Sequence, residues 1–185
     1  MKHPERIELT PGYSISRIIT GLWQVADIEK EDGSMDLGPA ASALVDYAES
    51  GFDTFDMADH YGSAELIAGH ARRKMQENDS ANRPSSQARF HTKWCPKPGE
   101  MTPQKVREGI LLSAERLDTE QIDLMQFHWW KYEHPHYLDA MEGLQSLKEE
   151  GIIRHLGLTN FDTDHLHPVS YTHLRAHETD SYRVC

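Results

Sequence analysis

Four side chains that can carry charge or transfer protons stand at or just after the ends of predicted strands. Asp56 ends a short apolar segment and Tyr61 follows five positions later, while Lys93 and His128 end two later segments. A carboxylate in an apolar strand is costly unless it has a partner, so Asp56 needs a cation or hydrogen-bond donors nearby. A phenol, an ammonium group and an imidazole in one place would combine acid catalysis with electrostatic stabilisation.

Each of these residues also has an ordinary structural interpretation. A lysine at a strand end is usually solvated or paired with a carboxylate, and a histidine there is usually hydrogen-bonded in the core. Their shared position favours a site, because parallel β/α proteins place their active sites at the carboxyl ends of the strands.

Alternating strands and helices must position these residues. Buried strands are predicted at residues 18–25, 52–57, 89–94, 122–129 and 155–160, after a hairpin at 6–17. Helices with one apolar face begin near Pro39, Ser63, Thr102 and His136. This α/β alternation indicates a parallel sheet with right-handed crossovers. A (β/α)8 barrel and a doubly wound sheet both fit, although no G-x-G-x-x-G follows any strand, which counts against a dinucleotide-binding doubly wound fold.

The composition excludes several classes of partner. With 19 Lys and Arg against 30 Asp and Glu, the net charge of −11 argues against binding to nucleic acid or to an anionic membrane surface. Two cysteines, Cys95 and Cys185, imply no disulfide framework. No apolar run is long enough to span a membrane, and the N-terminus lacks the apolar core of a signal peptide, so we expect a cytoplasmic location.

Four separated motifs resemble those of the aldo-keto reductases. They are GFDTFDMADHYG at 51–62, the strand-end Lys93, QFHW at 126–129 and GLTNF at 157–161, and the resemblance extends over roughly residues 6–166. It implies a (β/α)8 TIM barrel with an N-terminal hairpin closing its bottom. It also implies reversible reduction of an aldehyde or ketone to an alcohol, with NADP(H) as cofactor and NAD(H) not excluded.

The resemblance assigns a catalytic tetrad to Asp56, Tyr61, Lys93 and His128, and chemistry supports these roles. A free tyrosine has a pKa of about 10, so we expect the charge of Lys93 to lower the pKa of Tyr61. Asp56 would keep Lys93 charged and oriented. His128 would bond to the carbonyl oxygen, and Tyr61 would deliver the proton.

The resemblance also assigns contacts to the cofactor and to a small-molecule carbonyl substrate. The cofactor-binding residues would be Gly21, Trp23, Asp56, Thr159 and Asn160. Thr159 stands where the family usually has serine, and it keeps the hydroxyl that would hold the nicotinamide carboxamide. Aromatic walls of a substrate pocket are predicted at Trp23, Trp94 and Trp129, with ordinary packing as the alternative for the last two.

No metal site is expected from the histidine pairs. His134 and His136, like His165 and His167, have no carboxylate or cysteine at clear zinc spacing, so we interpret them as loop or surface residues.

The sequence departs from the family after the fifth predicted strand. Residues 1–167 are predicted to form a partial barrel, and residues 168–185 a disordered, non-family tail added in sequence assembly. Five strands cannot close an eight-stranded barrel, so the first and fifth would be edges. The alternatives to a reductase are an inactive fragment, a regulatory or binding subunit related to the family and, less well supported by the tetrad, an isomerase or hydrolase on another barrel.

Overall fold

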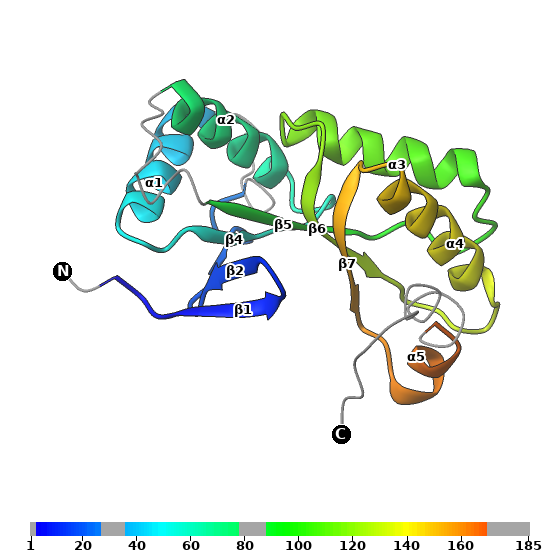
Figure 1. The fold of residues 1–185 in the computed structure, drawn as a ribbon. Coiled ribbons are helices and arrows are strands. Elements are labelled where there is room, and N and C mark those ends of the chain that lie inside the picture. Colours follow the sequence, from blue (N-terminus) through cyan, green and yellow to red (C-terminus); the bar gives the residue numbers. More distant parts are fainter. Residues whose placement is uncertain (1–2, 27–35, 78–87, 170–185) are drawn as a thin grey trace.

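The computed structural model describes residues 3–26, 36–77 and 88–169 of the chain (Figure 1). Its strands are β1 (Arg6–Thr10), β2 (Tyr13–Ser16), β3 (Thr20–Gly21), β4 (Thr54–Asp56), β5 (Arg89–Trp94), β6 (Ile122–His128) and β7 (Ile153–Thr159). Its helices are α1 (Leu37–Glu49), α2 (Ala64–Glu77), α3 (Pro103–Arg116), α4 (His136–Glu149) and α5 (Thr163–Val169). No helix within these ranges is both long and apolar enough to cross a membrane.

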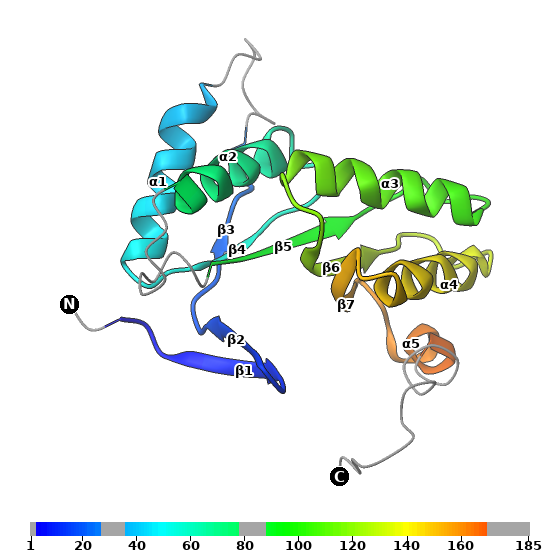
Figure 2. The same ribbon diagram turned by 45° about the horizontal axis from the view of Figure 1, so that its top comes forward.

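The parallel sheet has the strand order β3-β4-β5-β6-β7, the same as the order in the chain. Helices α1 to α4 lie along one face of the sheet, and the antiparallel hairpin β1–β2 lies apart from them (Figure 2). A doubly wound sheet would reverse its strand order and place helices on both faces. The structure therefore confirms the predicted barrel type, with five parallel strands and an N-terminal hairpin.

Local signals in the sequence set where the helices begin and end. The hydroxyl of Thr102 accepts the backbone N–H of Lys105 at 3.2 Å, which caps the start of α3. Gly51 and Gly151 follow α1 and α4 with positive φ angles of 88° and 83°. Glycine adopts this backbone region without steric cost, so these two residues turn the chain back towards the sheet.

Two sequence-based expectations for the fold are wrong. The predicted strand at 18–25 is reduced to Thr20–Gly21, and Ile18 and Ile19 are exposed because they connect the hairpin to the sheet without pairing in it. The apolar face expected for the helix that begins near Ser63 would include Leu66, but on α2 Leu66 is exposed, because the buried stripe runs through Ile67 and Ala71.

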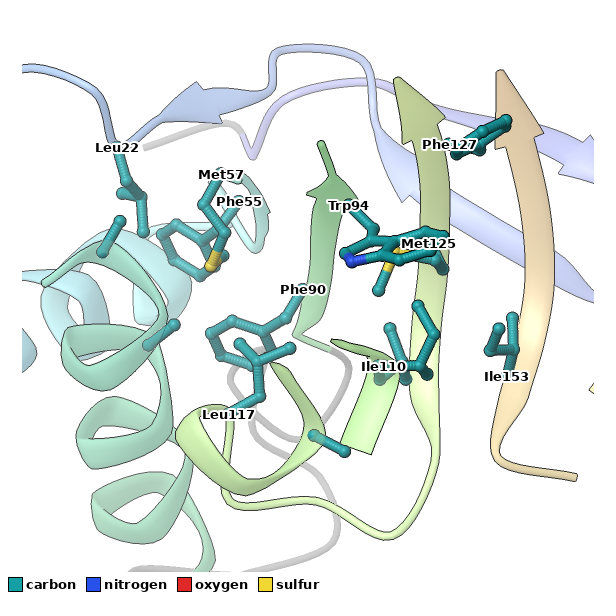
Figure 3. Packing of buried hydrophobic residues seen from close by; sticks show 14 of the residues in the cluster. Leu22, Phe55, Met57, Phe90, Trp94, Ile110, Leu117, Met125, Phe127 and Ile153 are labelled. Atoms are coloured by element: carbon teal, nitrogen blue, oxygen red, sulfur yellow. The ribbon is translucent and has the colours of Figure 1, made fainter. Parts of the chain in front are cut away.

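The main hydrophobic core lies between the sheet and its helices (Figure 3). The strands contribute alternate residues, including Phe55, Phe90 and Met125, and α3 contributes Ile110. Alternation along a strand sends the intervening residues to the opposite face. That opposite face corresponds to the interior of a barrel, and it carries the polar groups described below.

The hairpin covers this inner face through one buried aromatic residue. The hydroxyl of Tyr13 lies 2.9 Å from Nε2 of His91 on β5, and the ring of Tyr13 lies 4.2 Å from that of His155 on β7. Arg6 on β1 forms an ion pair with the buried carboxylate of Asp53. These contacts fix the hairpin to the sheet, as predicted for a segment that closes one end of a barrel.

His91 makes the stability of this contact depend on pH. Burial lowers the pKa of His91 from its ordinary 6.5 to about 4. Between these values the unfolded chain binds a proton that the folded chain does not, so stability falls as the pH drops from about 6.5 to 4. We expect His91 to contribute about 3 kcal/mol to this loss. Urea unfolding of the parent and of His91→Gln across this range should show a shallower decline in the variant, and parallel declines would contradict the assignment.

The outermost strands β3 and β7 have no further strand neighbour within the described ranges. Open strand edges pair readily with other chains. We therefore expect the 185-residue polypeptide to self-associate in a concentration-dependent way. Light scattering coupled to size-exclusion chromatography measures this, and a monomer at every concentration tested, with a sharp cooperative melt, would contradict it.

Candidate active site

The centre of the site is an ion pair between adjacent strands. Nζ of Lys93 on β5 donates to Oδ2 of Asp56 on β4 at 2.5 Å and to the backbone oxygen of Met57 at 3.0 Å. Lys93 is only 9% exposed. A buried ammonium group needs such partners, so the pair satisfies both the cation and the carboxylate.

Gln126 on β6 completes this arrangement, although the sequence alone predicted no role for it. Its Nε2 donates to Oδ1 of Asp56 at 3.0 Å, so each oxygen of that carboxylate has a donor. Gln126 pairs in register with Lys93. Gln126 precedes His128 by two positions, and residues two apart on a strand lie on the same face. This spacing is the sequence signal that could have predicted its place in the site.

Tyr61 lies in the loop between β4 and α2 with its ring held by neighbours. Trp23 packs edge-on against it with ring centroids 4.6 Å apart, and His60 does the same at 4.8 Å. Nζ of Lys93 lies 5.4 Å from the centroid of the Tyr61 ring. The structure therefore brings together the predicted acid, its predicted cation and Trp23.

The expected lowering of the Tyr61 pKa is wrong. Burial raises the pKa of Tyr61, and the negative charge of Asp56 and the neighbouring Cys95 raise it further. Lys93 does not reverse this, because Asp56 balances its charge. The phenol consequently stays protonated at neutral pH, as a proton donor must.

His128 ends β6 with both ring nitrogens buried and without a hydrogen-bond partner. Burial, the neighbouring His60 and the charge of Lys93 together lower its pKa, so the imidazole is neutral at pH 7. Buried polar atoms normally have partners. An unpartnered imidazole beside Lys93 is therefore a group that a bound oxygen would satisfy.

The loop that carries Tyr61 is anchored on both sides. The backbone N–H of Asp59 donates to the carbonyl oxygen of Lys93 at 2.9 Å, and Oδ2 of Asp59 accepts from the backbone of Cys95 at 3.0 Å. Arg116 on α3 donates to the carbonyl oxygen of Asp59 at 3.2 Å, and it also pairs with the buried Glu65 at 3.4 Å. These bonds hold the loop over the end of β5.

Strand register gathers the predicted cofactor residues at the same end of the sheet. Gly21 pairs with Asp56, and Thr159 pairs with His128. The hydroxyl of Thr159 lies 3.4 Å from Oε1 of Gln126. Asn160 follows with a left-handed φ of 66°, and its Nδ2 donates to the carbonyl oxygen of Trp129 at 2.9 Å.

Trp94 and Trp129 do not join this group, contrary to the prediction of a substrate pocket. Trp94 points to the helix side of the sheet (Figure 3), where a side chain at Gly109 of α3 would place its Cβ 2.4 Å from the indole nitrogen. Trp129 is 1% exposed and donates its indole N–H to the carbonyl oxygen of Lys131. Each follows an inward-facing residue, so strand alternation turns it away from the site.

No group of three or more metal-ligating side chains of His, Cys, Asp or Glu gathers within the described part of the chain. His136 instead lies beside Asp139, three residues later on α4. His165 on α5 lies beside Asp162, which directly precedes that helix.

Comparison with known proteins identifies the family. The model of the aldo/keto reductase family matches residues 17–180. The chain belongs to the aldo/keto reductase family. The predicted boundary of the family segment at residue 167 stays a prediction, and residues 170–185 of the predicted tail lie outside the described residues.

Curated relatives include two bacterial reductases. The chain is 29% identical over 166 residues to methylglyoxal reductase DkgA of Escherichia coli O157:H7, covering 90% of this chain and 53% of that protein. It is 26% identical over 178 residues to an NADH-specific methylglyoxal reductase of Escherichia coli K12, covering 85% and 52% respectively. The chain thus spans about half the length of the curated relatives it matches.

Solved structures show the same fold. An aldo-keto reductase of Bombyx mori in complex with NADP has a TM-score of 0.71 at 20% identity, over 93% of this chain and 55% of that chain. An aldo/keto reductase from Klebsiella pneumoniae, in complex with NADP and acetate, has a TM-score of 0.69 at 21% identity, over 90% and 53%.

The central ion pair predicts a measurable loss of stability. Asp56→Asn removes the counter-charge of Lys93 and leaves a buried ammonium group, so we expect the free energy of unfolding to fall by about 1–3 kcal/mol. Asp139→Asn is the matched control, because Asp139 is exposed on α4, and its effect should stay below about 0.5 kcal/mol. Equal urea midpoints for Asp56→Asn and the parent would show that the pair contributes nothing.

Proposed function

We propose that the protein to which this chain belongs reduces an aldehyde or ketone to an alcohol with NADPH or NADH, reversibly. The observation that carries the proposal is the cluster of Asp56, Lys93, Tyr61 and His128 at the carboxyl ends of neighbouring strands. A phenolic acid beside an unpartnered neutral imidazole matches the needs of an oxygen that gains negative charge.

Each residue of the cluster has a role that follows from its contacts. The neutral imidazole of His128 donates a hydrogen bond to the carbonyl oxygen and polarises it. Tyr61, protonated at neutral pH, transfers its proton to that oxygen as the C–O bond becomes single. Lys93 is paired with the carboxylate of Asp56, which Gln126 holds in place through a second hydrogen bond. The ammonium group of Lys93 stabilises the phenolate that remains.

The polar groups at the strand ends fit the nicotinamide part of the cofactor. The hydroxyl of Thr159 and the amide of Asn160 would hold the carboxamide, and Trp23 beside Tyr61 offers an exposed aromatic face. Gly21 has no atom within 4 Å of where a Cβ would lie, so its backbone is open to a ligand. The cofactor, when bound, supplies the hydride for the carbonyl carbon.

Methylglyoxal is the carbonyl compound that we propose to test first, because two relatives are methylglyoxal reductases. One of these is described as NADH-specific, and two similar structures contain NADP, so both cofactors belong in the test. A cytoplasmic location is part of the same proposal and rests on the sequence.

Cofactor binding and turnover test this function. Titration with NADPH, and in parallel with NADH, should quench tryptophan fluorescence in a saturable way. In protein that turns over methylglyoxal, Tyr61→Phe should lower kcat by at least about a hundredfold, the usual contribution of a general acid. Tyr47→Phe is the matched control, because Tyr47 is half exposed on α1, and it should behave as the parent does.

Quenching without turnover in the parent would support the alternative of a related binding subunit. Absence of quenching with either cofactor would contradict a reductase function for this chain. Full activity in Tyr61→Phe would remove Tyr61 from the role of acid.

A further inference from the structure

His128 combines two properties that do not agree with its proposed task. It stands at the carboxyl end of β6, where a substrate oxygen must reach it, yet neither ring nitrogen is accessible or hydrogen-bonded. Unsatisfied buried nitrogens cost free energy, so a folded protein retains them where a ligand or a movement satisfies them.

Trp130 is the aromatic side chain that stacks on this histidine. Its ring stacks on the imidazole of His128 with centroids 4.1 Å apart and planes tilted by 31°. The indole N–H of Trp130 donates to the thiol of Cys95, which follows Lys93 by two positions. The indole therefore bridges the ends of β5 and β6 across the imidazole.

The side chain of Trp130 is weakly held in comparison with its neighbours. Trp130 is 54% exposed, which is unusual for the largest apolar side chain. Trp129, immediately before it, is 1% exposed and its indole N–H bonds to a backbone oxygen. The backbone at this point is thus anchored, while rotation of the half-exposed Trp130 side chain breaks its stacking contact with His128 and its weak hydrogen bond to sulfur.

We propose that Trp130 is an aromatic gate on His128, closed in this structure, that must rotate away before a carbonyl oxygen can bond to the imidazole. The gate is inferred from these contacts and does not depend on the proposed function. Its consequence for specificity rests on the proposed function: with the gate closed or partly open, the space beside His128 admits small carbonyl compounds better than bulky ones. Trp130 acts here as a specificity-determining residue and not as a proton donor.

Acylation of histidine by diethyl pyrocarbonate tests the gate without substrate or cofactor. The reagent attacks an accessible nitrogen of a neutral imidazole, and peptide mass spectrometry at pH 7 gives a rate for each histidine. In Trp130→Ala we expect the acylation rate at His128 to rise about tenfold. This factor corresponds to the upper end of the stabilisation that one aromatic stacking contact gives to the closed state. Tyr47→Ala removes another exposed aromatic ring and should leave this rate unchanged.

Two histidines in the same sample report on the fold and on the reagent. His91 is buried and bonded to Tyr13, so it should stay unmodified in every folded variant. His60 has a partly exposed side chain and should react at the same rate throughout. An unchanged rate at His128 in Trp130→Ala, with His91 still protected, would overturn the gate.

A second variant decides the question if Trp130→Ala exposes His91 and has therefore lost its fold. Cys95→Ala retains the indole and removes its hydrogen bond to sulfur. Faster acylation of His128 in Cys95→Ala, with His91 protected, supports the gate, and the parent rate overturns it. Because neither readout involves turnover, an inactive protein with a faster reaction at His128 would refute the reductase function and leave the gate intact.

Discussion

The charge of Lys93 has to be held inside a parallel sheet, and the rest of the site follows from how this is done. An ammonium group that is almost removed from water needs a negative partner and further acceptors. Asp56 and the carbonyl oxygen of Met57 supply them from the neighbouring strand. Gln126 occupies the second carboxylate oxygen from the other side, so three adjacent strands share one polar contact set.

This contact set is consistent with Tyr61 being a protonated tyrosine and not a tyrosinate. Asp56 neutralises the lysine, and its own charge acts on the phenol together with burial. The lysine can therefore stabilise negative charge only as that charge develops on the phenol oxygen. In the proposed reaction, a group preorganised in this way would stabilise the transition state more than the ground state, as catalysis requires.

The sequence predicted the elements whose signals are local. The span of β5 and the starts of α3 and α4 follow from the apolar period and from capping residues, and the structure has them where they were predicted. The span predicted for the first sheet strand was wrong because the apolar residues Ile18 and Ile19 belong to the connection before β3. Hydrophobicity alone does not show whether a segment pairs with a neighbouring strand.

The residues of the site were predictable to the extent that they lie at strand ends. Asp56, Lys93 and His128 follow from position, whereas the role of Gln126 depends on register between two strands. The directions of Trp94 and Trp129 were available from alternation, since each directly follows an inward residue. The direction of the Tyr61 pKa shift was not, because it depends first on how far the folded chain buries the phenol and then on the nearby charge of Asp56.

The absence of a side chain at Gly109 has a consequence for how the protein tolerates change. The indole of Trp94 packs against the backbone of α3 at this glycine. Any larger residue at position 109 would displace either the helix or the indole. The indole belongs to Trp94, the residue that directly follows Lys93 on β5. A glycine on an outer helix is thus constrained by the strand that carries Lys93, and this position would accept alanine less readily than helix propensity alone predicts.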